Sequence, residues 1–185
     1  MFTQLSLPLS NKIFTAIDSH AAARQLLMLA AAVGCTQPVT ILDCGNRADM
    51  YAVARNLRLF TRDPVSALQR IRVSRAFTCY QIAALLRETA IAPGEPLFLP
   101  DILAAFFDDE VKPRDAARLF QKSLQHIKSI SETSPVLVTV RPVPSQASGK
   151  AFLLDYLVQA SHVVFESCAV LTPLQDIQPS LFIES

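Results

Sequence analysis

The chain has 185 residues, of which 51% are hydrophobic and 18% are charged, and its formal net charge is +1. This length fits one domain with small additions, and the apolar fraction is enough for a sizeable core. The nearly neutral balance gives no electrostatic sign of a nucleic-acid or membrane binder. The longest apolar run, residues 26–33, is too short to span a bilayer, and the N-terminus lacks a signal-peptide pattern. We therefore expect a soluble, cytoplasmic protein.

The cysteines and histidines show no pattern typical of a disulfide framework or a metal site. They are scattered, and no two cysteines form a C-x-x-C pair. We expect structural roles for all of them, with no metal and no cofactor: Cys35, Cys44, Cys79, Cys168, His20, His126 and His162.

Apolar runs typical of strands alternate along the chain with segments of helical periodicity. A strand-like run around Phe14 leads into a helix at 21–33. The following strands are predicted at 39–44, 70–76, 96–100, 134–140 and 161–167, and the following helices at 49–59, 79–89, 113–131 and 150–160.

This alternation predicts an α/β fold with a mostly parallel central sheet and helices on both faces. The near-continuous apolar runs favour strands that are buried on both sides. We expect a single domain over residues 1–185, with its core at about 12–167. Residues 1–10 could add a first strand or a docking strand, and residues 168–185 could add an edge strand.

Several segments resemble the RecA superfamily of recombinases. The run IRVSRAFTCYQ at 71–81 is similar to a strand and turn in which Arg-Ala-Phe is followed by a polar residue and Gln. PLFLPDILAAFF resembles the apolar strand that ends in a magnesium-associated Asp, which is Asp101 here. Residues 117–143 and 148–167 resemble the next helix, strand and following core segment. The resemblance implies a RecA-like P-loop fold, a three-layer sandwich, over most of the chain.

The phosphate-binding chemistry of that family is missing. A P-loop reads G-x-x-x-x-G-K-[ST], in which backbone N–H groups and the Lys hold the phosphates and the hydroxyl holds magnesium. In the register of the resemblance, Ala16 and Ala21 replace the glycines, Ala22 the lysine and Ala23 the hydroxyl residue. Asp18 would repel a phosphate. The degenerate positions are Ala16, Asp18, Ser19, His20, Ala21, Ala22 and Ala23.

Two further positions of the family's nucleotide site are also altered. The recombinases carry a Glu that activates water after the strand that matches 39–44, whereas Asp43, Cys44 and Gly45 place no carboxylate in that register. Polar amides that sense the γ-phosphate are replaced by Val140 and Arg141. Phosphoryl transfer depends on such positioning and charge stabilisation, so we predict a domain without ATPase activity.

Asp101 is the residual position of the magnesium-binding set. A lone Asp after a strand is equally typical of a helix N-cap, here for a short helix at 102–107. No catalytic residue is assigned.

The loops that resemble the DNA-binding loops of recombinases are not basic. DDEVKPR at 108–114 opens with three acids, and RPVPSQASGK at 141–150 carries charge only at its ends. A more basic stretch could meet an acidic partner or a nucleic-acid backbone, or could be a solvated face. Its arginines are Arg47, Arg55, Arg58, Arg62, Arg70, Arg72 and Arg75.

Three functions remain open from the sequence. The first is a non-catalytic RecA-like accessory or regulatory protein, with DNA repair or recombination as the context that the resemblance supplies. The second is a nucleotide-binding ATPase in which Arg24, Lys12 or a partner's arginine replaces the lost lysine. The third is a homo-oligomeric structural module. We expect a protein partner or self-association, possible nucleic-acid contact and no membrane contact.

Overall fold

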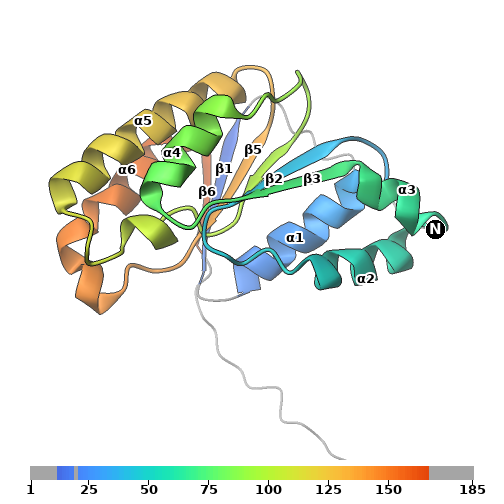
Figure 1. Ribbon diagram of the computed structural model, residues 1–185, viewed down its shortest axis with the longest axis horizontal. Coiled ribbons are helices and arrows are strands. Elements are labelled where there is room, and N and C mark those ends of the chain that lie inside the picture. Colours follow the sequence, from blue (N-terminus) through green and yellow to red (C-terminus); the bar gives the residue numbers. More distant parts are fainter. Residues whose placement is uncertain (1–11, 19–20, 167–185) are drawn as a thin grey trace, which may run out of the picture.

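The structure of the chain is a computed structural model, which describes residues 12–18 and 21–166 (Figure 1). The predicted additions at 1–10 and 168–185, together with Ser19, His20 and Cys168, lie outside the described residues. The side chain of Ala21 is also not described.

A six-stranded sheet forms the centre of the described chain, in the order β3-β2-β4-β5-β1-β6. Every neighbouring pair of strands is parallel. β1 lies between β5 and β6: Ile13 pairs with Val136 of β5, and Phe14 pairs with Val163 of β6. The strands are β1 (Ile13–Ile17), β2 (Val39–Asp43), β3 (Ile71–Arg75), β4 (Leu97–Leu99), β5 (Val136–Val140) and β6 (Val163–Glu166). The predicted parallel sheet is confirmed.

The helices follow the predicted alternation with one addition, α3. Asp63 caps this short helix and Pro64 begins it, a pairing that suits a helix N-terminus. The α-helices are α1 (Ala21–Gly34), α2 (Met50–Phe60), α3 (Pro64–Gln69), α4 (Cys79–Glu88), α5 (Pro113–Ser131) and α6 (Phe152–Ala160). Two short 3-10 turns are η1 (Ala104–Phe106) and η2 (Ser145–Lys150).

Helices cover both faces of the sheet, which confirms the α/β three-layer arrangement. Figure 1 shows α4, α5 and α6 on one face and α1, α2 and α3 on the other. Successive residues of a buried strand enter opposite cores: Leu97 and Leu99 pack toward α4, α5 and α6, whereas Phe98 packs toward α1 and α2. This alternation explains why β4 is apolar at every position.

The outer strands differ from the inner ones. All residues of β2, β4 and β5 are buried, as expected for strands that are covered on both sides. In β3 only Ile71 is buried, and in β6 no residue is. The expectation of burial on both faces is therefore wrong for β6, which lies at the end of the sheet, where the helices cover its faces less completely. The run that forms β3 alternates apolar residues with Arg and Ser, which agrees with its partial exposure.

Candidate functional site

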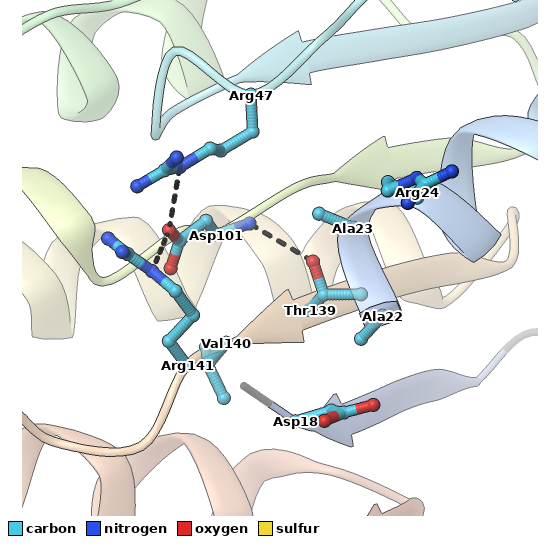
Figure 2. A pocket seen from close by; sticks show the side chains of 9 residues that line it. All are labelled: Asp18, Ala22, Ala23, Arg24, Arg47, Asp101, Thr139, Val140 and Arg141. Atoms are coloured by element: carbon cyan, nitrogen blue, oxygen red, sulfur yellow. Dashed lines mark hydrogen bonds and ion pairs between the residues drawn. The ribbon is translucent and has the colours of Figure 1, made fainter. Parts of the chain in front are cut away.

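A cavity of about 280 Å³ opens where the carboxyl ends of β1, β4 and β5 meet (Figure 2). In parallel α/β sheets this edge is where ligands bind. The lining residues are Asp18, Ala22, Ala23, Arg24, Arg47, Asp101, Thr139, Val140 and Arg141. Three separate segments singled out by the resemblance thus face one cavity: the degenerate phosphate loop, the residual Asp101 and the end of β5.

The phosphate-loop positions that the structure describes belong to the end of a strand and the start of a helix. Ala16 lies inside β1 and pairs with Thr139, so it is a strand residue and not the first residue of a loop. Ile17 ends β1 and Ala21 begins α1, which leaves only residues 18–20 between them. A six-residue G-x-x-x-x-G turn needs more chain to surround a phosphate. Ala22 and Ala23 present methyl groups to the cavity, without charge or hydroxyl.

Asp101 follows β4 in a left-handed backbone conformation, with a φ of 52°. Its backbone N–H donates to Thr139 Oγ1 at 3.1 Å. Its carboxylate Oδ2 accepts from Arg141 Nε at 2.6 Å and pairs with Arg47 Nε at 3.6 Å. The alternative of a helix N-cap is wrong, because the next helix along the described chain is η1, which begins at Ala104, has Leu103 at its N-cap position and makes no side-chain cap hydrogen bond. The carboxylate that the resemblance associates with magnesium is therefore paired with two guanidinium groups.

Asp43 holds the loop that carries Arg47. Its buried carboxylate accepts from the backbone N–H groups of Arg47 at 2.8 Å and Ala48 at 3.0 Å. It also accepts from Arg75 Nε at 2.9 Å. With both oxygens bonded inside the protein, this carboxylate is a positioning group for the loop and does not line the cavity. The sequence analysis gave Asp43 no role.

The neighbouring thiol is not a candidate nucleophile. Burial raises the pKa of Cys44, and the nearby carboxylates of Asp43 and Asp101 raise it further. The neutral S–H donates to the Leu42 carbonyl at 3.3 Å. Burial also raises the pKa of Cys79. Reactive cysteines have depressed pKa values, so these two thiols are structural.

The Arg-Ala-Phe run that carries the resemblance forms a helix start. Thr78 is the N-cap of α4, and its hydroxyl accepts from the Gln81 backbone N–H at 3.2 Å. The Gln81 side chain reaches back to the Phe77 N–H at 2.8 Å. This reciprocal arrangement satisfies two N–H groups at the start of the helix, as a capping box does. The spacing of Thr and Gln in this run therefore has a local structural explanation.

The arginines of the proposed basic patch divide into two sets. Arg70 donates to the carbonyls of Gly34 and Cys35, and Arg72 and Arg75 bind Glu95 and Asp43. Arg47 pairs with Asp101, as described above. The set that is exposed and makes no hydrogen bond or ion pair with other described residues is Arg55, Arg58 and Arg62. Four of the seven arginines are thus engaged within the fold, which weakens the argument for a continuous basic surface.

The two loops at 108–114 and 141–150, which the resemblance compares with recombinase DNA-binding loops, offer little positive charge. Asp108, Asp109 and Glu110 are all exposed. At the ends of the second loop, the Arg141 guanidinium is held by Asp101, and the buried Lys150 ammonium donates to the Asp108 carbonyl. The Lys150 ammonium is therefore engaged inside the protein, and the Arg141 guanidinium is held toward Asp101 through its Nε atom, away from the exposed part of the loop.

The convergence of Arg47 and Arg141 on Asp101 was not predicted from the sequence. A signal existed, since each arginine comes one to four residues after a buried strand, and the carboxyl ends of neighbouring parallel strands meet at one edge. The sequence analysis instead placed Arg47 in a basic patch and treated Arg141 as the replacement of an amide.

Comparison with known proteins does not assign the chain. No protein-family model matches it, and no curated protein matches it. Within residues 12–18 and 21–166, no helix is long and apolar enough to cross a membrane. The same residues contain no group of three or more His, Cys, Asp or Glu side chains arranged to hold a metal ion.

Proposed function

We propose that this protein is a catalytically silent RecA-like domain that acts as an accessory or regulatory partner, with DNA repair or recombination as its context. One observation carries the proposal. The cavity in Figure 2 is bordered by the three segments that the resemblance makes into a nucleotide site, yet they present alanines, a valine and paired arginines instead of the glycines, lysine and hydroxyl of a P-loop. Phosphoryl transfer in P-loop proteins relies on a lysine and a magnesium ion to stabilise charge. Here the position of the lysine is Ala22, and the Asp101 carboxylate is paired with two arginines.

The sheet edge supports a role in association. β3 is an outer strand of the described sheet, so one side of its backbone has no neighbouring strand. Val73 and Phe77, on and just after this strand, are exposed. An open edge with apolar side chains can accept an added strand from another chain. Residues 1–10, the predicted docking strand, lie outside the described residues.

Calorimetry with magnesium-ATP and magnesium-ADP, together with a phosphate-release assay, tests the loss of catalysis. We expect no phosphate release and no nucleotide binding in the micromolar range. Micromolar binding with turnover would contradict the proposal and favour the alternative of an ATPase with a non-standard loop. Arg24 lines the cavity and is the candidate lysine substitute in that alternative. Arg24→Ala would then abolish the binding.

The partner role needs a second measurement. Sedimentation velocity on the chain alone and with a recombinase assembled on single-stranded DNA separates an accessory protein from a homo-oligomeric module. Co-sedimentation with the assembly supports the proposal. Concentration-dependent self-association, with no effect of the recombinase, supports the structural module instead.

A further inference from the structure

Two arginines from different loops meet beside the cavity. Arg47 comes from the loop after β2 and Arg141 follows β5, and both Nε atoms approach the same oxygen of Asp101 (Figure 2). The cavity is lined by three arginines and two aspartates, which gives a net charge of +1. One carboxylate therefore balances only one of the two converging guanidinium groups.

Both guanidinium groups keep unused donors. Each has five N–H groups, and the contact with Asp101 is made through Nε, which carries one of them. The Nη atoms of Arg47 and Arg141 make no hydrogen bond with any other described residue. Their side chains are 43% and 38% exposed, so a ligand can reach them. Guanidinium groups bind planar and tetrahedral oxyanions through paired N–H donors.

The loop that carries Arg47 is fixed in place. Asp43 binds two of its backbone N–H groups, and Asn46 has a left-handed φ of 53°. Gly45 packs so closely that a Cβ there would lie 2.7 Å from Asp101 Cβ. Left-handed backbone at residues other than glycine carries strain that concentrates at ligand sites. Asn46 and Asp101 are the two residues other than glycine with a positive φ in the described chain. Asn46 follows Gly45 directly, and Asp101 is the residue against which Gly45 packs.

The loop that carries Asp101 is anchored to β5, which leads directly to Arg141. Thr139 accepts the N–H of Asp101 on its hydroxyl and the N–H of Ile102 on its carbonyl. The two arginines are thus positioned before any ligand arrives, which lowers the ordering cost of binding. On the opposite wall, Ala22 and Ala23 belong to the first turn of α1, where the positive end of the helix dipole adds to the field.

We propose that this cavity binds a small phosphate group through the side chains of Arg47 and Arg141, without a metal ion. The volume of about 280 Å³ lies just under the roughly 300–1,000 Å³ of pockets that hold drug-sized ligands, which favours a small anion over a whole nucleotide. The inference rests on the proposed function, because it requires that Asp101 pairs with arginines and does not hold a magnesium ion. The phosphate group could be free orthophosphate or part of a larger small molecule such as pyrophosphate.

Calorimetric titration of the full chain in EDTA with inorganic phosphate tests the site, with sodium chloride at matched ionic strength as the reference. We expect saturable binding with a Kd of about 1 mM or tighter. Arg141→Ala and Arg47→Ala each weaken binding about tenfold or more, because each removes charge-assisted hydrogen bonds. Arg141→Lys restores only part of the affinity, since an ammonium cannot form the paired contact. A parallel titration with pyrophosphate shows which source the cavity prefers.

Arg55→Ala is the matched control, because Arg55 is exposed on α2 and does not line the cavity. It should bind phosphate as the unmodified chain does. Equal affinity in Arg47→Ala, Arg141→Ala and the unmodified chain overturns the inference, as does the absence of heat above the chloride reference up to about 20 mM phosphate. Because EDTA removes metal ions, either outcome is independent of whether magnesium-ATP is hydrolysed, so the inference and the proposed function fail separately.

Discussion

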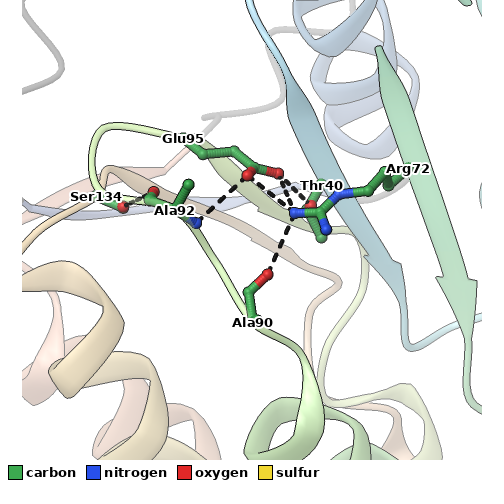
Figure 3. A network of polar contacts seen from close by, with 6 residues as sticks. All are labelled: Thr40, Arg72, Ala90, Ala92, Glu95 and Ser134. Atoms are coloured by element: carbon green, nitrogen blue, oxygen red, sulfur yellow. Dashed lines mark hydrogen bonds and ion pairs between the residues drawn. The ribbon is translucent and has the colours of Figure 1, made fainter. Parts of the chain in front are cut away.

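The two ends of β4 each carry a buried carboxylate bound to arginine, but the two sites are built differently. Before the strand, Glu95 accepts from Thr40 Oγ1 at 2.5 Å, from Arg72 Nη2 at 2.7 and 2.9 Å, and from the Ala92 N–H at 3.4 Å (Figure 3). After the strand, Asp101 meets two guanidinium groups through one oxygen. Both oxygens of Glu95 accept hydrogen bonds within the protein. Around Asp101, by contrast, the two guanidinium groups have more N–H donors than the carboxylate uses.

The difference in how the two carboxylates are bonded indicates different roles for the two ends of β4. Arg72 also donates to the Ala90 carbonyl at 3.2 Å, and the Ser134 hydroxyl donates to the Ala92 carbonyl at 3.0 Å. The Glu95 network therefore joins four segments: β2, β3, the chain before β4 and the chain before β5. No cavity residue belongs to it. The arginines at the Asp101 end still have donors available and face a cavity. We infer that the Glu95 end stabilises the sheet and that the Asp101 end is available for a ligand.

Asp43→Ala should give the largest loss of stability, and it should release the loop that places Arg47 beside Asp101. Removing a fully buried carboxylate leaves two backbone N–H groups and the Arg75 guanidinium without their acceptor. Each buried donor left without its acceptor costs about 1–3 kcal/mol, and the half-exposed Arg75 regains water, so we expect a total loss of about 3 kcal/mol in the free energy of unfolding. Urea denaturation measures the loss. An unfolding free energy within about 1 kcal/mol of the unmodified chain would show that the loop is held by other contacts.

Glu95→Gln should lower the free energy of unfolding by about 2–3 kcal/mol. The amide NH₂ would replace one carboxylate oxygen and would face a group that donates to that oxygen in the unmodified chain. The Glu95 side chain is only 6% exposed, so water cannot readily replace the lost acceptor. Urea denaturation at neutral pH gives the value. Glu88→Gln is the matched control, since Glu88 is exposed and its ion pair with Arg87 lies on the surface. Equal costs in the two variants would contradict a stabilising role for the network.

The Glu95 network should also make stability depend on acid pH. Burial by itself raises the pKa of Glu95, but the hydrogen bonds from Thr40, Arg72 and Ala92 outweigh it and hold the pKa below the usual 4.5. A carboxyl group with a lowered folded-state pKa contributes stability that is fully present above pH 4.5 and is lost as the pH falls through the folded-state value. The difference in unfolding free energy between the unmodified chain and Glu95→Gln should therefore shrink below pH 4.5. A difference that stays constant with pH would exclude this linkage.

The sequence predicted the architecture well because its evidence was local. Burial on two faces makes β2 and β5 mostly apolar, with Thr40, Asp43 and Thr139 as the polar exceptions. The 113–131 helix begins at a proline and follows one apolar stripe, so its predicted bounds match α5. The outer strands were less clear, since an apolar run such as that of β6 does not tell whether a neighbour covers it.

The site was only partly predictable for a different reason. The resemblance directed attention to Asp101 and to the alanines near α1, and these do line one cavity. The arginine contacts depend on tertiary geometry: Arg47 and Arg141 are 94 positions apart in the sequence, and only the parallel order of the strands brings their loops together. Asp43 was missed because a carboxylate that binds backbone N–H groups across a turn has no sequence signature distinct from any other strand-end Asp.

Of these three carboxylate substitutions, Asp101→Asn should have the smallest effect on stability. It tests directly whether the two buried carboxylates at the ends of β4 have different roles. The amide oxygen can take the place of Oδ2 and keep the contact with Arg141, while the half-exposed guanidinium groups regain water. We expect a loss of about 1 kcal/mol, clearly below that of Glu95→Gln. Denaturation of both variants under the same conditions gives the ranking. If Asp101→Asn cost as much as Glu95→Gln, Asp101 would be a structural carboxylate of the same kind, and the arginines beside it would exist to neutralise it. A small cost instead means that the fold does not need this cluster for its stability, so its three loops and two arginines call for another role, and a phosphate group is the ligand that their donors fit.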